Sequence, residues 1–223
     1  KKIIKSSIDN QGFPKSRSIN QLVFYLKYFI IIREWFKESQ KIVPEYIDET
    51  IYYLGSSYAF VWQNINQDIL FNGNYISNNN EFDQYLKRFN YKFKNENKEF
   101  AGYAILKNKK IGLVMDIGSS PNKNFSKDYQ AGALSFEIIS NQKKLISNSG
   151  YFDNKYNQFN KLSKSSALQN TLIIEDYSSC SFKKIDKSNF IVNQDLKITK
   201  KNIIYEDNYW KISAAHDGYF HKF

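Results

Sequence analysis

The sequence has few of the residues that hold small or metal-bound folds together. Cys180 is the single cysteine among 223 residues, so the chain can form no internal disulfide and no zinc site made of several thiolates. No histidine lies near it in the sequence, so Cys180 is expected to be a packed strand residue rather than a nucleophile. With only two histidines in the chain, zinc would need ligands from elsewhere.

Long apolar runs are also missing. The most apolar run, at 29–32, is four residues long, whereas a helix needs about 20 apolar residues to cross a bilayer. No signal peptide is recognisable in the sequence. We therefore predict no membrane span within this chain.

The composition is that of a folded protein with an excess of positive charge. Hydrophobic residues make up 42% of the sequence and aromatic residues 17%, enough for the core of one large or two modest domains. The net charge of +10 suits nucleic acid, anionic lipid or acidic polysaccharide, although solvated lysine faces are the commoner source of such a charge. No nucleic-acid recognition motif is present, so nucleic acid is not a predicted partner.

The first part of the sequence has helical periodicity. Apolar and aromatic residues recur three and four apart between 22 and 36, and Ser18 is a suitable N-cap, which predicts an amphipathic helix. A second helix is expected after Val43, with Pro44 near its first turn. Its apolar stripe alternates spacings of four and three: Ile47, Ile51, Leu54, Tyr58 and Val61. A short helix is expected to carry Phe82, Tyr85, Leu86 and Phe89.

From residue 100 onward the period of the pattern changes to two. Runs at 101–106 and 111–116 predict one antiparallel hairpin. Runs at 134–139 and 143–148, joined by the turn residues Asn141-Gln142, predict a second. Further strands are expected at 170–174, 181–184, 190–192, 196–199, 203–206 and 209–215. Repeated short strands with polar turns indicate a sandwich or stacked antiparallel sheets.

Four sequence blocks follow one another in this second half. They are ALSFE at 133–137, LISNSG at 145–150, SSALQNTL at 165–172 and AAHDGY at 214–219. In order and spacing they resemble the C-terminal sheet domain of the heparinase II/III-like family. The resemblance covers most of residues 100–223 and, more weakly, the helical part before them.

The resemblance implies an α+β multidomain fold, in which the C-terminal helices of an incomplete α/α toroid precede an antiparallel β-sandwich. The end of the helical toroid domain is expected at 1–75, a linker with a short helix at 76–99, and the first part of the sandwich at 100–223. Members of the family are polysaccharide lyases whose active site lies in the cleft between toroid and sandwich. The chain is thus expected to be a middle-to-late fragment of such a protein, with a periplasmic or cell-envelope location in a bacterium.

The implied activity is cleavage of an acidic, uronate-containing glycan by β-elimination. This reaction neutralises the sugar carboxylate, removes the C5 proton and protonates the departing oxygen. Amide or cationic donors suit the carboxylate, whereas Tyr and His suit the proton transfers. The predicted partner is an acidic polysaccharide, and the oligomeric state is left open. An alternative is a catalytically weakened relative that binds or helps process cell-envelope polysaccharide.

The resemblance also assigns the sheet-domain site residues. The family's sandwich histidine falls on Gln169, which can hydrogen-bond a sugar but cannot act as a general base. A role in satisfying backbone groups is an equal alternative for Gln169. A second family histidine falls on Gln130, and His216 and Tyr219 match the fourth block. Gln169 and His216 are the catalytic candidates; the candidates for substrate binding in this part are Gln130, Asn170 and Tyr219.

The helical part supplies the remaining candidates. The family's helical-domain tyrosine lies in a polar, glycine-containing loop that matches 11–20, where this chain has no tyrosine. Arg17 and Asn20 are the polar candidates for substrate binding there. Arg17 can neutralise a carboxylate with two parallel hydrogen bonds, and a capping or surface role is an open alternative. No cofactor and no metal site are predicted.

Overall fold

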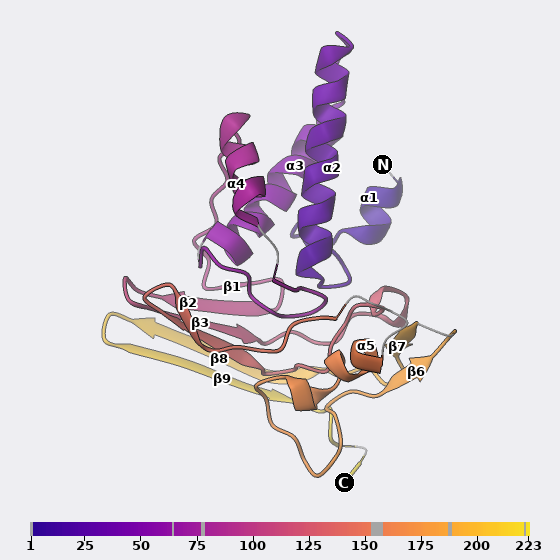
Figure 1. Ribbon diagram of the computed structural model, residues 1–223, viewed down its shortest axis with the longest axis vertical. Helices are drawn as coiled ribbons and strands as arrows, with labels where there is room; N and C mark the ends of the chain where they lie inside the picture. The colour runs from indigo at the N-terminus through magenta and orange to yellow at the C-terminus, as the bar shows by residue number, and fades with distance from the viewer. Residues whose placement is uncertain (1, 64, 77–78, 153–157, 187–188, 221) are drawn as a thin grey trace.

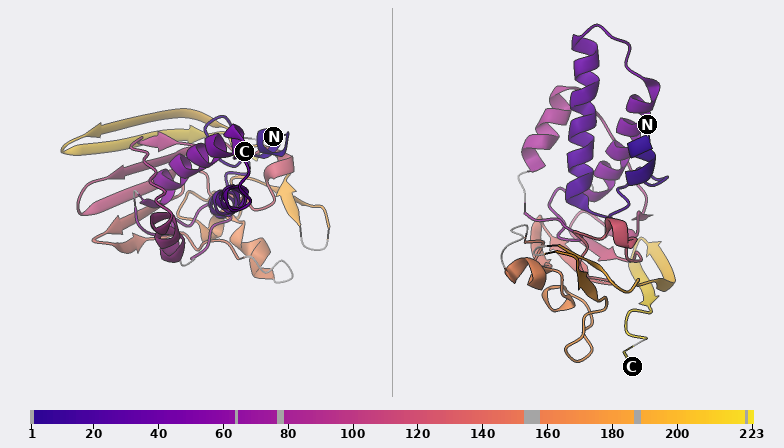
Figure 2. Two further views of the ribbon diagram at one scale, coloured as in Figure 1. Left: turned by 90° about the horizontal axis from the view of Figure 1, so that it is seen from above. Right: turned by 90° about the vertical axis from the view of Figure 1, so that its right-hand side faces the viewer.

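The computed structural model describes residues 2–63, 65–76, 79–152, 158–186, 189–220 and 222–223. Helices from the first part of the chain stand on one face of an antiparallel sheet formed by the second part (Figure 1). Figure 2 shows the same two layers from above and from the side. The predicted fold class, helices followed by antiparallel sheets, is confirmed.

Two long helices form most of the helical part. Helix α2, Ile19–Glu38, begins after Ser18, whose hydroxyl accepts a hydrogen bond from the backbone of Gln21 at 3.3 Å, so the predicted cap is confirmed. Helix α3, Glu45–Tyr58, follows Pro44 and continues as a π-helical turn, Ala59–Gln63. Every residue of the predicted apolar stripe of α3 is buried, because this face packs against α2 and the sheet.

Two shorter helices complete this part. The predicted short helix is confirmed as α4, Asn79–Arg88, and it buries Leu86 in the core. Helix α1, Lys2–Ser7, was not predicted, because six residues are too few to display a helical period. The backbone N–H of Lys15 donates to the carbonyl of Ser7 at 2.9 Å and ties α1 to the loop before α2.

The main sheet has five antiparallel strands in the order of the sequence. They are β1 Glu99–Phe100, β2 Tyr103–Lys107, β3 Ile111–Asp116, β4 Phe136–Ser140 and β5 Lys143–Ile146. Both predicted hairpins are therefore confirmed. Asn141 and Gln142 join β4 to β5 with φ of 48° and 63°, the pair of positive values that a tight two-residue hairpin turn needs.

Four further strands lie outside the main sheet. Strands β6, Phe182–Lys184, and β7, Phe190–Val192, form a small hairpin. Strands β8, Ile198–Glu206, and β9, Tyr209–His216, form a long hairpin that runs below the β1 and β2 side of the main sheet (Figure 1). The hydroxyl of Tyr205 on β8 donates to the carbonyl of Lys107 at 2.7 Å and joins the two layers.

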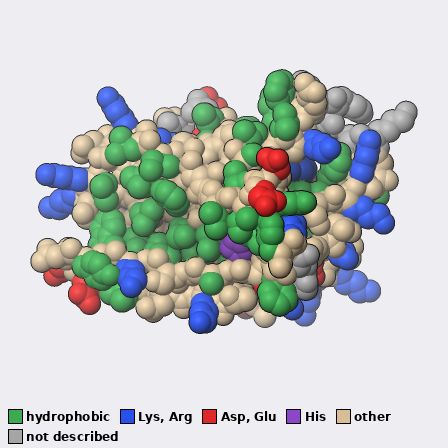
Figure 3. Space-filling view, turned by 90° about the horizontal axis from the view of Figure 1, so that it is seen from below, with side chains coloured by type: hydrophobic (Ala, Val, Ile, Leu, Met, Phe, Trp, Pro, Cys, Tyr) green, Lys and Arg blue, Asp and Glu red, His purple; other side chains and the backbone are tan. Residues whose placement is uncertain are grey.

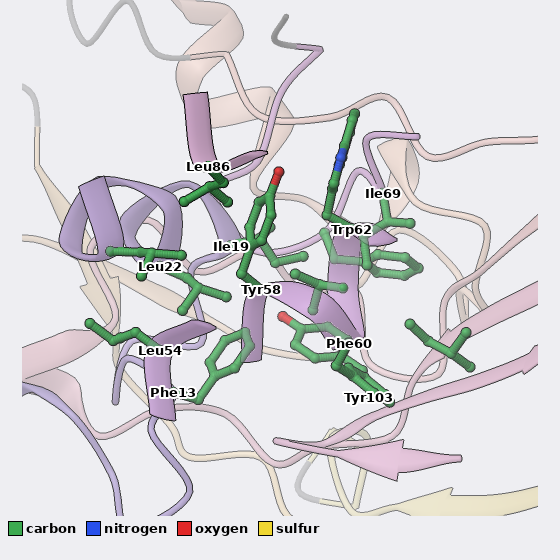
Figure 4. Packing of buried hydrophobic residues seen from close by; sticks show 14 of the residues in the cluster. Phe13, Ile19, Leu22, Leu54, Tyr58, Phe60, Trp62, Ile69, Leu86 and Tyr103 are labelled. Atoms are coloured by element: carbon green, nitrogen blue, oxygen red, sulfur yellow. The ribbon is translucent and has the colours of Figure 1, made fainter. Parts of the chain in front are cut away.

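The main core lies between the helices and the upper face of the sheet. Phe13, Tyr58, Phe60 and Tyr103 are fully buried there, with their rings packed among aliphatic residues from α2, α3 and the sheet (Figure 4). A second, smaller cluster joins the β3–β4 connection to segments that follow the sheet, and it contains Tyr129, Ala131, Ala133, Cys180, Val192 and Leu196. The helical part and the sheet part thus share one core rather than folding on separate ones.

Two strand predictions were wrong. Residues 170–174 form no strand, because a side-chain hydrogen bond replaces the backbone hydrogen bonds of a strand pair. The hydroxyl of Thr171 donates to the carbonyl of Ala133 at 2.6 Å, and Leu172 is 65% exposed. The strands expected at 196–199 and 203–206 are parts of one strand, β8, which contains a register shift between Ile198 and Lys200.

The segment from residue 151 to residue 168 contains two short helical segments among its described residues. They are α5, Gln158–Ser163, and a 3-10 turn, Ser166–Leu168. Cys180 is packed as predicted, but in the loop before β6 rather than in a strand. Burial raises the pKa of its thiol to about 12, so Cys180 is not a thiolate nucleophile.

Candidate functional site

Three of the predicted site residues meet at an open hollow of about 730 Å³. Its polar groups come from Gln169, Asn170, Thr171 and His216, and its apolar ones from Met115, Leu134, Phe136, Ile146 and Leu172. Figure 3 shows the molecule from below, where a histidine side chain reaches the surface beside hydrophobic side chains. None of these lining residues is Asp, Glu, Lys or Arg, so the hollow offers neutral hydrogen-bonding groups in an apolar surround.

The hollow lies on the face of the sheet turned away from the helices. Successive side chains on a strand point to opposite faces. On β3 the buried Asp116 faces the helical part, so Met115 faces the hollow. On β4 the carboxylate of Glu137 accepts a hydrogen bond from the backbone of Leu70 on the helical side, so Phe136 faces the hollow. The hollow and the junction between helices and sheet are therefore two separate places.

His216 is the residue of the hollow that can exchange a proton near neutral pH. Its Nδ1 accepts a hydrogen bond from the backbone N–H of Gly218 at 3.0 Å. The neutral ring must then carry its proton on Nε2, as this hydrogen bond assigns it. Burial lowers the pKa of His216, and the charge of Asp217 only partly opposes this. At neutral pH His216 is therefore an uncharged hydrogen-bond donor.

The two glutamines among the predicted site residues converge on one carbonyl oxygen. Nε2 of Gln169 donates to the carbonyl of Ser163 at 3.3 Å, and Nε2 of Gln130 donates to the same oxygen at 2.6 Å. Gln130 also donates to Gly150 O at 3.1 Å and accepts from the N–H of Gly73 at 3.2 Å. Gln130 thus ties the loop after the helices to the sheet part, while Gln169 lies between that network and the hollow.

Asn170 and Tyr219 hold the polar edge of the hollow in place. The side-chain oxygen of Asn148 accepts a hydrogen bond from the backbone of Asn170 at 2.8 Å. The hydroxyl of Tyr219 donates to the carbonyl of Leu172 at 2.8 Å, and its ring centroid lies 5.6 Å from that of His216. Burial raises the pKa of Tyr219, so it stays a phenol at neutral pH.

Arg17 lies at the junction between the helices and the sheet. It forms an ion pair with Asp116 at 2.6 Å, and the two side chains are 11% and 1% exposed. The guanidinium also donates at 3.0 to 3.2 Å to three carbonyl oxygens, those of Gly102, Gly118 and Ser119. Burial is the largest single influence and lowers the pKa of Arg17, but the charge of Asp116, its hydrogen bond and the nearby Tyr103 and Tyr129 together outweigh it, so the pKa is raised. Arg17 is held by the protein itself.

Sequence reasoning missed two polar residues of this junction, Asp116 and Asn72. Nδ2 of Asn72 contacts Asp116 at 2.9 Å and the hydroxyl of Tyr103 at 2.7 Å. A signal was present in each case. Asp116 ends an apolar strand pattern, and Asn72 precedes Gly73 in a turn where both have positive φ.

The predicted site residues thus divide into groups. Gln169, Asn170 and His216 line the hollow and Tyr219 supports its edge, whereas Arg17 and Gln130 belong to the junction. Asn20 is half-buried in the first turn of α2. Among the residues that the structure describes, no group of three or more His, Cys, Asp or Glu side chains is placed to hold a metal ion. No helix in the same residues has the length and apolar character needed to cross a membrane.

Solved structures with the same arrangement of helices over antiparallel sheets establish the class of fold. A crystal structure of heparinase III matches 97% of this chain and 40% of its own length, with 16% identity and a TM-score of 0.63. A heparan sulfate lyase, HepC from Pedobacter heparinus, matches 97% of this chain and 38% of its own, with 14% identity and a TM-score of 0.64. This chain thus shares its fold with part of each of these two structures, and it spans about 40% of their length.

The sequence identifies the family, which the fold alone does not. Residues 97–223 match the family model described as Heparinase II/III-like, C-terminal. That match covers more than half of the chain, so the chain belongs to the heparinase II/III-like family. No curated protein matches it.

Proposed function

We propose that this protein acts on acidic, uronate-containing glycans as a polysaccharide lyase, and that the hollow binds the uronate carboxylate through neutral donors. The observation that carries the proposal is the convergence of Gln169, Asn170 and His216 on one hollow in a chain of this family. One similar structure is named a heparan sulfate lyase, and we take heparan-type glycans as the first substrates to test. A periplasmic or cell-envelope location is part of the proposal, because such glycans lie outside the cytoplasm.

The chemistry of β-elimination fits the donors that the hollow offers. Negative charge builds up on the uronate carboxylate when the C5 proton leaves, and fixed donors stabilise that charge most in an apolar surround. In the proposal, Nε2–H of His216 donates to the carboxylate, and the amide of Gln169 contacts a sugar hydroxyl. The apolar residues of the hollow exclude water and strengthen both contacts.

Removal of the C5 proton needs a base that neither glutamine provides. An amide can donate and accept hydrogen bonds, but it does not take up a proton near neutral pH. Nδ1 of His216 is occupied by the N–H of Gly218, so this nitrogen is not free to act as the base either. The proposal therefore assigns proton removal to a group other than Gln130, Gln169 and His216.

A second candidate function is glycan binding without cleavage. The sequence feature that favours it is glutamine at 130 and 169, two positions where the resemblance to the family leads us to expect histidine. Such a protein would bind acidic glycans through the same hollow and release no product. The two candidates share a ligand and differ in turnover, so one assay separates them.

The test uses the full-length protein with heparan-type, chondroitin-type and alginate polymers. Lyase activity appears as absorbance of the unsaturated uronate product, and binding is measured separately by calorimetry. Product from any of the three supports the lyase. Binding without product supports the second candidate, and the absence of both contradicts the two.

Variants of the hollow link the result to this site. We expect His216→Phe to lower kcat/KM roughly 100-fold, because it removes the Nε2–H donor to a developing charge and puts no other donor in its place. Gln169→His should raise turnover if the base was lost at this position. Gln40→His is the matched control, because Gln40 is exposed in the turn after α2, and it should change nothing. Equal activities of His216→Phe and the parent protein would show that the hollow takes no part in the reaction.

A further inference from the structure

A second pocket, of about 740 Å³, lies between α5 and the β6–β7 hairpin and is strongly basic. We name it the lysine pocket after four lining residues: Lys161, Lys164, Lys184 and Lys222. Among its described lining residues, Asp176 is the only acidic one. None of the ion pairs that the structure describes involves any of these four lysines, whereas Arg17, with a side chain 11% exposed, is paired with Asp116.

Lys164 makes this cluster more than a solvated surface. Its side chain is 2% exposed, and burying an ammonium without a carboxylate partner is unfavourable. Its Nζ donates to the carbonyl of Lys127 and lies 3.4 Å from that of Tyr129. It also lies 5.6 Å from the centroid of the Phe182 ring, which lines the pocket. Carbonyl dipoles, the rings of Tyr151 and Phe182 and the nearby charge of Asp128 stabilise this ammonium, and an anion in the pocket would stabilise it further.

The other walls of the lysine pocket suit a ligand with an apolar face. The rings of Tyr177 and Phe190 line it, and Tyr177 is 49% exposed. Nζ of Lys222 donates to the carbonyl of Ser178 and lies 5.3 Å from the Tyr177 ring centroid. An ammonium has three donors, so Lys222 keeps hydrogen-bonding capacity for a ligand. Ammonium groups beside aromatic faces bind anionic groups carried on a ring.

The lysine pocket and the hollow lie on either side of one short segment. The hydroxyl of Tyr219 donates to the carbonyl of Leu172, which lines the hollow, at 2.8 Å. The same hydroxyl lies 3.4 Å from the carbonyl of Tyr177, which lines the lysine pocket. One tyrosine therefore joins the rims of both sites, and a chain of sugars that occupies the hollow can extend toward the lysines.

We propose that the lysine pocket binds the sulfate or carboxylate of a further sugar unit of an acidic glycan, next to the unit in the hollow. The choice of a glycan as ligand rests on the proposed function, but anion binding by the four lysines does not. The hollow supplies neutral donors and the lysine pocket supplies charge. Binding at the lysine pocket should therefore weaken with salt, because exposed charges are screened.

Two neighbouring lysines on β6 give a matched test. Lys184 lines the pocket, whereas Lys183 is also exposed but points to the other face of the strand. The full-length protein and its variants Lys184→Glu and Lys183→Glu are titrated with a sulfated heparan-type oligosaccharide, a neutral dextran and inorganic sulfate. We expect Lys184→Glu to weaken oligosaccharide binding roughly tenfold and Lys183→Glu to leave it within about twofold. Circular dichroism checks that both variants fold.

The outcomes separate this proposal from the lyase proposal. Loss of binding in Lys184→Glu but not in Lys183→Glu supports the lysine pocket, even if no product forms. Equal binding by the two variants overturns it, even if product forms. Tight binding of inorganic sulfate with no gain for the oligosaccharide overturns the assignment to a glycan. Binding of dextran as strong as that of the oligosaccharide overturns the role of charge.

Discussion

The ion pair between Arg17 and Asp116 yields a prediction about how the helices are attached to the sheet. The two side chains are 11% and 1% exposed, and Asp116 is the only carboxylate paired with Arg17 among the described residues. Asp116→Asn keeps the size of the side chain and one oxygen acceptor but removes the negative charge. The guanidinium of Arg17 is then buried without a counter-charge.

The expected loss of stability is large because the cost of the unpaired charge remains after the attraction is gone. Breaking a buried pair from one side typically costs about 3 to 5 kcal/mol. For a chain of this size, 1 kcal/mol shifts Tm by roughly 2 to 4 °C, so Asp116→Asn should lower Tm by about 10 °C. Urea denaturation should give a lower midpoint with an unchanged m value.

A surface ion pair in the same chain serves as the control. Glu99 pairs with Lys201, and these side chains are 33% and 49% exposed. Exposed pairs contribute about 1 kcal/mol or less, so Glu99→Gln should change Tm by only a few degrees. The double variant Arg17→Met with Asp116→Asn should be less destabilised than the sum of its single variants, because no unpaired charge is left. If Asp116→Asn cost no more than Glu99→Gln, the account of the junction would be refuted.

Three further predictions concern single side chains. Burial lowers the pKa of Lys164 from 10.5 to about 8, so the unfolded chain binds more protons than the folded one between these two pH values. Relative to Lys164→Met, the free energy of unfolding should therefore rise by about 3 kcal/mol as pH rises through this range. Parallel pH profiles of the two proteins in urea denaturation would contradict this. Gln142 has a φ of 63°, so Gln142→Gly should stabilise the chain by about 0.5 to 1 kcal/mol in thermal unfolding; a decrease would show that the side chain matters more than the backbone. Tyr219→Phe removes the hydrogen bond to Leu172 and should cost about 1 kcal/mol and weaken glycan binding, whereas unchanged calorimetry would exclude Tyr219 as a support of the hollow.

Local pattern was enough to predict most of the secondary structure. The stripe on α3 and the turn at Asn141 and Gln142 are set by residues close together in the sequence, and both were predicted. The strand expected at 170–174 failed because its pattern is decided by distant partners. Thr171 there bonds Ala133, 38 positions earlier in the sequence. A side-chain hydrogen bond to so distant a residue, which replaces the hydrogen bonds of a strand pair, cannot be recognised from the neighbouring sequence.

The site residues were predictable one by one but not as a group. Four sequence blocks pointed to Gln169, Asn170 and His216, and these residues do line one hollow. Arg17 was expected to meet a sugar carboxylate, and in the structure it is paired with Asp116, 99 positions away. An arginine indicated a carboxylate partner bound by two hydrogen bonds. Only the packing of the helices on the sheet decided that this carboxylate is Asp116 of the protein and not that of a sugar.

The sequence by itself determined the class of most elements and the family, because periodicity, caps, turn residues and motif order are local properties of the chain. The tertiary structure decided which polar groups lie together. It placed the neutral donors in the hollow, brought the amides of Gln130 and Gln169 to the carbonyl of Ser163, and gathered four lysines, none in an ion pair among the described residues, around one pocket. These groupings depend on contacts between distant segments, since a buried polar group is stable only where the fold brings it a hydrogen-bond partner.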